Sequence, residues 1–205
     1  IDKYGEFLSA IDPEAGIPVL KEALRLTSED DPKLAPRKLA LGSNLMEVGQ
    51  FSEAELTLTE AVKIYEKNLG EDNLETLAAI LKLAQLYLSL GKSISAKELY
   101  ERAVPKMEKI IDKNDFLILD SKANLAEIYR LHGKYTLSEN FFLESMRGAV
   151  EEYGEEDTLV MQIKSNLAKL YEDTGKLNKA LSLHEQVYKI ELMTLGETHP
   201  NSAGN

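Results

Sequence analysis

A glycine followed by glutamine or lysine recurs along this chain at one constant spacing. The four copies are Gly49-Gln50, Gly91-Lys92, Gly133-Lys134 and Gly175-Lys176, and each glycine lies 42 residues after the one before. Small residues recur in the same frame, seven positions before each glycine (Gly42, Ala84, Ala126 and Ala168) and five positions after it (Ala54, Ala96, Ser138 and Ala180). A repeat of this length is typical of proteins built from stacked supersecondary units, each packing against its neighbours.

Each repeat is expected to contain two helices. Apolar side chains recur at intervals of three and four residues before the second glycine, across residues 80–87, and after the first glycine, across residues 54–65. That spacing lines one face of an α-helix. A glycine can end the first helix in the left-handed conformation because it has no Cβ. Since only about three residues separate the two helices, they must lie antiparallel, which predicts an all-α fold of helical hairpins.

Local signals predict where the second helices begin and end. Ser52 and Thr136 are each followed three residues later by a glutamate, which is the pattern of a capping box. Ser93 and Asn178 are the corresponding candidate caps in the other two repeats. The ends of these helices are predicted at Gly70, Gly154 and Gly196.

Pro105 lies inside the predicted second helix of the second repeat. An interior proline removes one backbone hydrogen bond and costs about 3 kcal/mol unless the helix kinks. We therefore expect this helix to bend or to end early, near Val104.

The 42-residue frame divides the chain into four full repeats. Their boundaries fall at residues 35–76, 77–118, 119–160 and 161–202. Before residue 35 the frame breaks, so residues 1–34 are expected to form a degenerate repeat or cap, with one helix from Pro18 to Thr27. Residues 203–205 are expected to be a truncated tail. His199-Pro200 begins what would be a further repeat, which predicts more repeats or a capping helix in the natural protein.

Composition limits the classes of partner. Among 205 residues, 35 are acidic and 24 are basic, and the net charge of −11 opposes binding to nucleic acid and to anionic membrane surfaces. The chain has no cysteine for disulfides or thiolate metal sites. No apolar run approaches the roughly 18 residues that span a bilayer, and no signal peptide is evident. We expect a soluble intracellular protein, in the cytoplasm or an organelle interior.

Few residues are available for catalysis. The only histidines are His132, His184 and His199, and the first two are expected to have structural roles. His132 precedes a helix-ending glycine, and His184 falls in a column of large packing side chains (Leu58, Tyr100 and Phe142). No HExxH, GxSxG or phosphate-binding glycine spacing occurs, and the acidic run at residues 151–157 lacks the loop of a calcium site. We therefore expect no enzyme activity, cofactor or metal.

Several segments resemble a known repeat family. They are Asn124–Tyr129, Asn166–Tyr171, Gly133-Lys134-Tyr135, Gly175-Lys176-Leu177 and Leu195–Pro200. Together they resemble the 42-residue tetratricopeptide repeats of the kinesin light chain type, over residues 35–202. The resemblance implies a right-handed α-solenoid of antiparallel helical hairpins. The chain departs from the family pattern in having no tryptophan and in placing Leu45 where tyrosine is usual, whereas the other repeats have core tyrosines there (Tyr87, Tyr129 and Tyr171).

Polar residues mark a second face on the first helix of each repeat. Positions thirteen, nine, six and two before each glycine lie together at helical spacing, and the resemblance implies that this face lines a concave groove. The candidate partner-binding residues are Ser43, Lys82, Gln85, Asn124, Glu127, Arg130, Asn166 and Lys169. Asn124 and Asn166 each carry a donor and an acceptor that suit the backbone of an extended peptide. The alternative is a polar face that only keeps the surface soluble.

One subtype of the resembling family does not fit. Repeats that bind the carboxylate tails of heat-shock chaperones carry a lysine ten positions and an asparagine six positions before the glycine. The corresponding pairs here are Leu39 and Ser43, Leu81 and Gln85, Ala123 and Glu127, and Ser165 and Lys169. None has that combination.

The sequence therefore favours a non-catalytic scaffold or adaptor that binds a peptide or a helix of a partner protein in its groove. Two alternatives stay open. One is an assembly element whose terminal repeats stack end to end in self-association. The other is a repeat module that regulates a catalytic domain within a larger protein.

Overall fold

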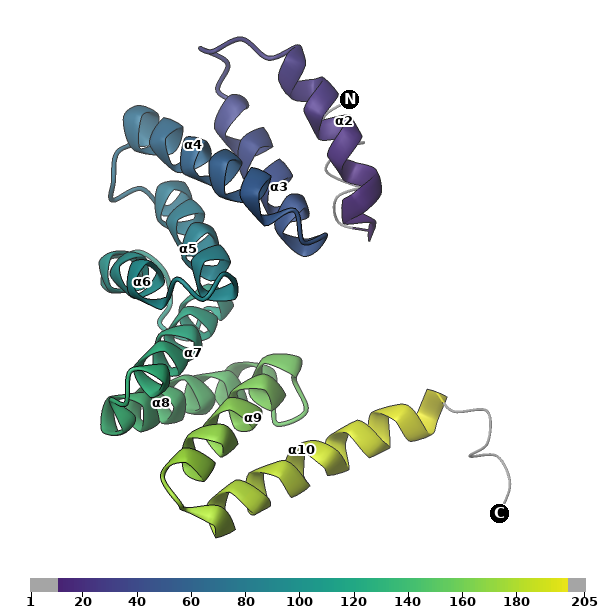
Figure 1. Ribbon diagram of the computed structural model, residues 1–205, viewed down its shortest axis with the longest axis vertical. Coiled ribbons are helices and arrows are strands. Elements are labelled where there is room, and N and C mark those ends of the chain that lie inside the picture. The colour runs from purple at the N-terminus through teal and green to yellow at the C-terminus, as the bar shows by residue number, and fades with distance from the viewer. Residues whose placement is uncertain (1–10, 199–205) are drawn as a thin grey trace. The chain divides into compact units, whose positions relative to one another are not determined.

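A computed structural model describes residues 11–198, with side chains through residue 193, and regular structure in this range is entirely helical. The chain divides into two compact units, residues 1–111 and 112–205. The first contains α2 (Pro13–Arg25), α3 (Leu34–Glu47), α4 (Phe51–Leu69), α5 (Leu74–Ser89) and α6 (Ser93–Met107). The second contains α7 (Phe116–Leu131), α8 (Tyr135–Tyr153), α9 (Thr158–Asp173) and α10 (Leu177–Thr198) (Figure 1). The predicted all-α fold is confirmed for the described residues.

The first unit is built from helical hairpins. α3 packs on α4 and α5 on α6, while α4 also packs on α5 and α2 on α3. Leu45 on α3 and Leu58 on α4 are fully buried between their helices. The small residue at Gly42 is required here, because a Cβ at that position would lie 2.6 Å from Cγ of Leu58. This close approach explains the repeating column of small residues.

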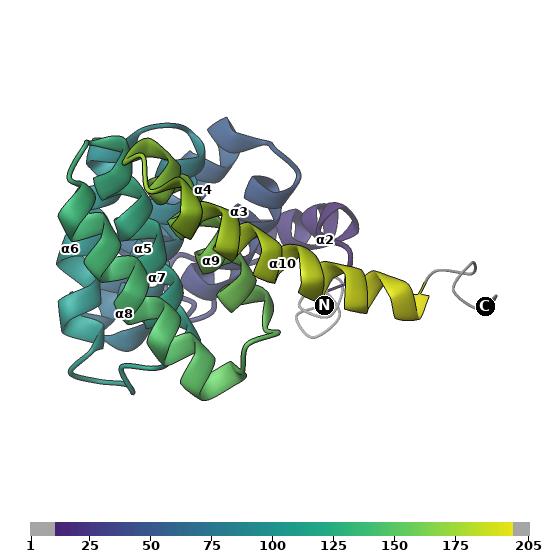
Figure 2. The same ribbon diagram turned by 90° about the horizontal axis from the view of Figure 1, so that it is seen from below.

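The second unit has the same construction. α7 pairs with α8 and α9 with α10, and α8 packs on α9. Its core contains Phe142 from α8 together with Ile163, Leu167 and Tyr171 from α9. Figures 1 and 2 both show the later part of α10 extending beyond α9.

Each repeat glycine ends a first helix with the same turn. Gly49, Gly91, Gly133 and Gly175 have φ between 69° and 77°, in the left-handed region that glycine adopts without strain. The amide of the following residue donates to the carbonyl five positions back, at 2.8 Å in all four turns (Gln50 to Leu45, Lys92 to Tyr87, Lys134 to Tyr129 and Lys176 to Tyr171). This pattern is the Schellman motif, so the predicted role of the glycines is confirmed.

The predicted caps of the second helices are wrong. α4, α6, α8 and α10 begin at Phe51, Ser93, Tyr135 and Leu177, so Ser52, Ser93, Thr136 and Asn178 lie inside them. The cause is the Schellman turn, which delivers the residue after each glycine directly into the next helix. For example, the Gln50 carbonyl already accepts from the amide of Ala54 at 3.0 Å. Side-chain caps occur instead on the first helices, where Asn73, Asp115 and Asp157 accept from backbone amides.

Pro105 shortens its helix as expected. α6 has 15 residues, whereas α4 and α8 have 19 each. The helix ends at Met107, three residues after the predicted point at Val104. It continues briefly because the missing proline amide removes a hydrogen bond to the preceding turn and leaves the following carbonyls unaffected.

Two other helices, α2 and α10, depart from their predicted bounds. α2 begins at Pro13 rather than Pro18, because Asp12 caps it by accepting from the amide of Ala15 at 3.0 Å. It ends at Arg25 rather than Thr27. α4 and α8 end before Gly70 and Gly154 as predicted, but α10 continues past Gly196 to Thr198. A glycine inside a helix costs only about 1 kcal/mol and does not force it to end. His199-Pro200 and the predicted tail at residues 203–205 lie outside the described residues.

Candidate partner-binding surface

The first helices of adjacent repeats lie next to each other within each unit. α3 contacts α5 in the first unit, and α7 contacts α9 in the second. The eight predicted residues divide between the units. Three lie in the first (Ser43, Lys82 and Gln85) and five in the second (Asn124, Glu127, Arg130, Asn166 and Lys169). The structure therefore presents two separate sets of candidate residues.

In the second unit the predicted residues, with two polar neighbours, define a set of residues on the first helices that we call the α7–α9 strip. It consists of Asp120, Asn124, Glu127 and Arg130 on α7 and Asn166, Lys169 and Asp173 on α9. The two helices are joined across the strip by an ion pair between Arg130 and Asp173. Asp120 and Asp173 were not among the predicted binding residues, although both occupy the same helix face in the repeat frame.

Arg130 is the centre of the α7–α9 strip. Its Nε and one terminal nitrogen donate to the two carboxylate oxygens of Glu127, each at 2.8 Å. Only 15% of its side chain is exposed. The hydrogen bonds to Glu127, and then the one to Asp173, raise the pKa of the guanidinium above its ordinary value. Arg130 is thus a fixed positive charge that holds two carboxylates in place.

The two asparagines of the strip are used in complementary ways. Asn124 donates from Nδ2 to Oδ2 of Asp120 at 3.0 Å, whereas Oδ1 of Asn166 accepts from Nζ of Lys169 at 3.2 Å. Both contacts are local to one helix. Among the described residues, the side-chain oxygen Oδ1 of Asn124 and the side-chain nitrogen Nδ2 of Asn166 have no hydrogen-bond partner. One acceptor and one donor therefore remain for a ligand.

The three candidates of the first unit are less well connected. Ser43 donates to the carbonyl of Leu39 at 2.9 Å, which is a contact within its own helix. Lys82 donates from Nζ to Oε1 of Gln85 at 3.0 Å, so these two predicted residues do meet on α5. Ser43 lies on the neighbouring helix α3 and shares no hydrogen bond with them in the described structure. This set offers a weaker basis for a binding surface.

The repeated tyrosines have structural roles. Tyr129 and Tyr171 are buried, as predicted, and Tyr87 is half-buried. In each case the lysine after the repeat glycine lies over the ring, with Nζ 5.2 to 5.7 Å from the ring centroid. Lysines at this distance interact favourably with an aromatic face. The tyrosines are therefore part of the turn that closes each hairpin.

Tyr171 also belongs to an ion-pair network between α8 and α9. Its hydroxyl donates to Oε1 of Glu139 at 3.0 Å, and Lys176 bonds the other oxygen of Glu139 at 2.7 Å. Burial raises the pKa of Tyr171 to about 12, and the hydrogen bond to Glu139 adds to this effect. The hydrogen bond from Lys176 lowers the pKa of Glu139.

His184 does not pack as the sequence predicted. The equivalent side chains Leu58, Tyr100 and Phe142 are fully buried, whereas 47% of the His184 side chain is exposed. Its Nε2 lies 2.9 Å from Oε1 of Glu172 on α9. The ring is directed to this carboxylate instead of the hairpin core. His132 is the C-cap of α7, as its place before Gly133 predicted.

Within residues 11–193, no group of three or more histidine, aspartate or glutamate side chains is arranged to hold a metal ion. No helix in the described part of the chain is long and apolar enough to cross a membrane.

The model of the tetratricopeptide repeat family matches residues 34–109 and 117–192. No curated protein is significantly similar to the chain in sequence.

Several solved structures have a similar fold. A Podosopora anserina protein with nearly identical TPR-like repeats of kinesin light chain type has a TM-score of 0.75 and 22% identity, over 94% of this chain and 93% of that one. BtubC (BKLC) from P. vanneervenii has a TM-score of 0.71 and 24% identity, over 87% and 73% of the two chains. MamA from Desulfovibrio magneticus RS-1 has a TM-score of 0.65 and 15% identity, over 92% and 94%. At these identities the similarity concerns the fold.

Proposed function

Since this chain belongs to the tetratricopeptide repeat family, with an α-solenoid fold of the kinesin light chain-like type, we propose that it binds a peptide or a helix of a partner protein on the α7–α9 strip. Tetratricopeptide repeats commonly serve as non-catalytic scaffolds for protein interactions, because stacked hairpins present an extended surface to a ligand.

The main support is the geometry of the strip itself. Arg130 fixes Glu127 and Asp173 on two adjacent helices, so the polar groups between them are held in a defined arrangement. Preorganised groups lose little conformational entropy when a ligand binds. Asn124 and Asn166 then supply one free acceptor and one free donor for a peptide backbone.

The charges of the strip indicate the chemistry of the partner. It carries three carboxylates (Asp120, Glu127 and Asp173) and two cations (Arg130 and Lys169). The strip is therefore slightly acidic, and the whole chain has a net charge of −11. A peptide with basic side chains would be attracted, whereas nucleic acid would be repelled.

A peptide library provides a test that needs no known partner. Peptides selected on the wild-type protein would be titrated by calorimetry against Asn124→Ala, Asn166→Ala and the double variant. Loss of the two hydrogen bonds is expected to weaken binding about 10-fold or more in the double variant. Asn178→Ala is the matched control, because Asn178 is exposed on α10 of the same unit. Selected peptides that bind the double variant as tightly as wild type would contradict the proposal.

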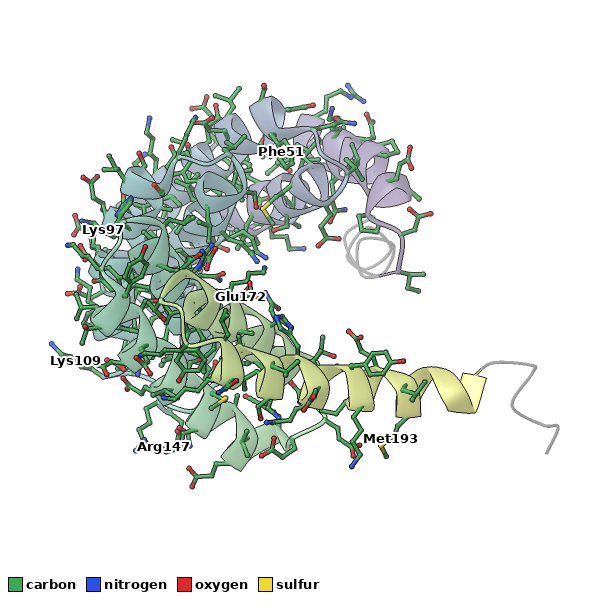
Figure 3. All side chains as sticks on the ribbon, turned by 60° about the horizontal axis from the view of Figure 1, so that its bottom comes forward. Phe51, Lys97, Lys109, Arg147, Glu172 and Met193 are labelled. Atoms are coloured by element: carbon green, nitrogen blue, oxygen red, sulfur yellow. The ribbon has the colours of Figure 1, made fainter. Side chains whose placement is uncertain are left out.

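A second candidate function is self-association through α10. Leu181, Tyr188 and Leu192 follow one another at helical spacing on this helix and are 58%, 66% and 57% exposed. Figure 3 shows that Met193, which follows Leu192 on another face of the helix, also projects away from the ribbon. Such an apolar row favours contact with a second apolar surface. Light scattering of wild type and Tyr188→Glu at increasing concentration tests this function, and a wild-type protein that stays monomeric throughout contradicts it.

A further inference from the structure

The first hairpin of each unit contains a cavity in the same place. In the first unit, a cavity of about 450 Å³ is lined by Lys38, Glu60, Lys63 and Ile64, among others. In the second, a cavity of about 450 Å³ is lined by Lys122, Glu144, Arg147 and Gly148 in the equivalent positions two repeats later. Lys38 bonds Glu60 and Lys122 bonds Glu144, each at 2.7 Å. The two cavities therefore share their position in the hairpin and a lysine–glutamate ion pair in their lining.

The cavity of the second unit, which we call the α7–α8 pocket, is rich in charge. Its lining includes three cations (Lys113, Lys122 and Arg147) against two carboxylates (Glu144 and Glu151). This excess of positive charge is local, since the chain as a whole is strongly acidic. Lys113 and Arg147 form no ion pair within the described residues, and Figure 3 shows Arg147 projecting from α8 at the edge of the unit. The pocket can therefore attract an anion.

Lys122 is the central group of the pocket. Only 5% of its side chain is exposed, whereas Glu144, to which it donates, is 61% exposed. A buried ammonium requires a compensating negative charge. An exposed glutamate can rotate into solvent at little cost, so its place can be taken by another anion. Arg147 offers the planar guanidinium that pairs well with carboxylate or phosphate.

Gly148 shapes the pocket wall. A Cβ at this position would lie 2.8 Å from Cδ2 of Leu119 and 2.9 Å from Oδ1 of Asn114, two residues that also line the pocket. In the first unit the equivalent residue is Ile64, whose side chain contributes an apolar surface. The second unit therefore has the more polar of the two cavities.

We propose that the α7–α8 pocket binds a small organic anion, bearing a carboxylate or a phosphate, that replaces Glu144 as a partner of Lys122 and pairs with Arg147. A volume of about 450 Å³ lies in the range of small-molecule sites. The pocket is lined by residues of α7 and α8 and of the segment before α7. It shares no residue with the α7–α9 strip and does not depend on the function proposed for that surface.

The test is a titration of the whole chain followed by amide NMR, with citrate as the carboxylate probe and adenosine monophosphate as the phosphate probe, at constant ionic strength. Either probe, at up to about 10 mM, is expected to shift the amide signals of Asn114 and Gly148. A response to citrate alone assigns the pocket to carboxylates, and a response to the nucleotide alone assigns it to phosphate esters. No response to either probe overturns the proposal.

Two exposed-residue variants make the test specific. Glu144→Gln removes the competing carboxylate and is expected to tighten binding about threefold or more, whereas Arg147→Gln is expected to weaken it by a similar factor. Lys189→Gln on α10 makes the same change of charge as Arg147→Gln but lies outside the pocket, and should leave binding unchanged. Weaker or unaltered binding to Glu144→Gln, or equal effects of Arg147→Gln and Lys189→Gln, would overturn the proposal.

Discussion

Arg130 on α7 and Asp173 on α9 lie 43 residues apart in the sequence and form an ion pair between the first helices of adjacent repeats. The same guanidinium is held by both carboxylate oxygens of Glu127. The α7–α9 strip is thus a rigid surface, because its central charge is fixed from two helices.

Removing Arg130 should therefore destabilise the second unit. In Arg130→Ala the carboxylates of Glu127 and Asp173 lose their shared cation, and we expect a loss of roughly 1–3 kcal/mol in the free energy of unfolding. Asp173→Asn should cost less, about 0.5–1 kcal/mol, because Glu127 still holds the arginine. Urea unfolding of the intact chain measures both values. If the two variants lose equal amounts of unfolding free energy, the hydrogen bonds to Glu127 contribute nothing to stability.

Two buried serines on α8 should respond in opposite directions to alanine. The hydroxyl of Ser138 is buried without a hydrogen-bond partner in the described structure, and the equivalent residues Ala54, Ala96 and Ala180 are alanine. Ser138→Ala is therefore expected to stabilise the protein by about 0.5–1 kcal/mol. Thermal unfolding measures the change.

Ser145 is the matched control for this prediction. It is also fully buried, but its hydroxyl donates to the carbonyl of Leu119 at 2.6 Å and links α8 to α7. Ser145→Ala should destabilise by about 1 kcal/mol. A shift of the melting temperature in the same direction for both serine variants would contradict the assigned hydrogen bonding.

Gly42→Ala tests the close contact between α3 and α4. The new methyl group would meet Leu58 at 2.6 Å, so overpacking of about 1–3 kcal/mol should exceed the gain of up to about 1 kcal/mol in helix propensity. The double variant Gly42→Ala/Leu58→Ala should lose less than the sum of the single changes, because Leu58→Ala makes room for the methyl group. If urea unfolding shows additive losses in the free energy of unfolding, the contact with Leu58 is not the cause of the destabilisation.

The network of Tyr171, Glu139 and Lys176 predicts a dependence on pH. The folded pKa of Tyr171, about 12, is above its ordinary value of 10, so its contribution to stability is complete below pH 10 and is lost as the pH rises toward 12. Glu139→Gln should lower the pKa of Tyr171 but leave it above 10, because burial is the larger cause. NMR titration of isotopically labelled tyrosine measures this shift. An unchanged pKa in the variant would contradict the hydrogen bond.

At acid pH, the dependence of stability on pH in the same network has the opposite sign. The pKa of Glu139 is below its ordinary value of 4.5, so its contribution is complete above that pH and is lost as the pH falls below it. Lys176→Gln should therefore make stability less sensitive to pH in this acid range. A free glutamate titrates at about pH 3 to 5. If Lys176→Gln loses as much stability as wild type over this range, Lys176 does not lower the pKa of Glu139.

The repeat frame predicted most of the fold because its signals are local. The turn at Gly49 needs a left-handed residue, and only glycine provides it without strain, so the sequence pattern and the helix ends agree. The caps at Ser52 and Thr136 could not be predicted in the same way. The start of each second helix depends on how the preceding turn is closed. The Schellman hydrogen bond donated by Gln50 closes the turn at Gly49, so that α4 begins at Phe51, before Ser52.

The candidate site was predictable only in part. Helical spacing placed Asn124 and Asn166 on one face, and the structure brings their helices together in one unit. The pairing of Arg130 with Asp173 depends on which rotamer each side chain adopts between helices, which no single-sequence pattern specifies. The α7–α8 pocket was missed for a related reason. Its lining combines residues of the segment before α7 with residues of α7 and α8, and that combination is set by how these helices pack.

The central claim is that a partner peptide binds on the α7–α9 strip. The most direct measurement is amide NMR of the intact chain during titration with a library-selected peptide. We predict that the largest shift changes fall within residues 120–131 of α7 and 162–173 of α9, and that they disappear in Asn124→Ala/Asn166→Ala. Changes confined to α8 or α10, or changes that persist in the double variant, would contradict the claim.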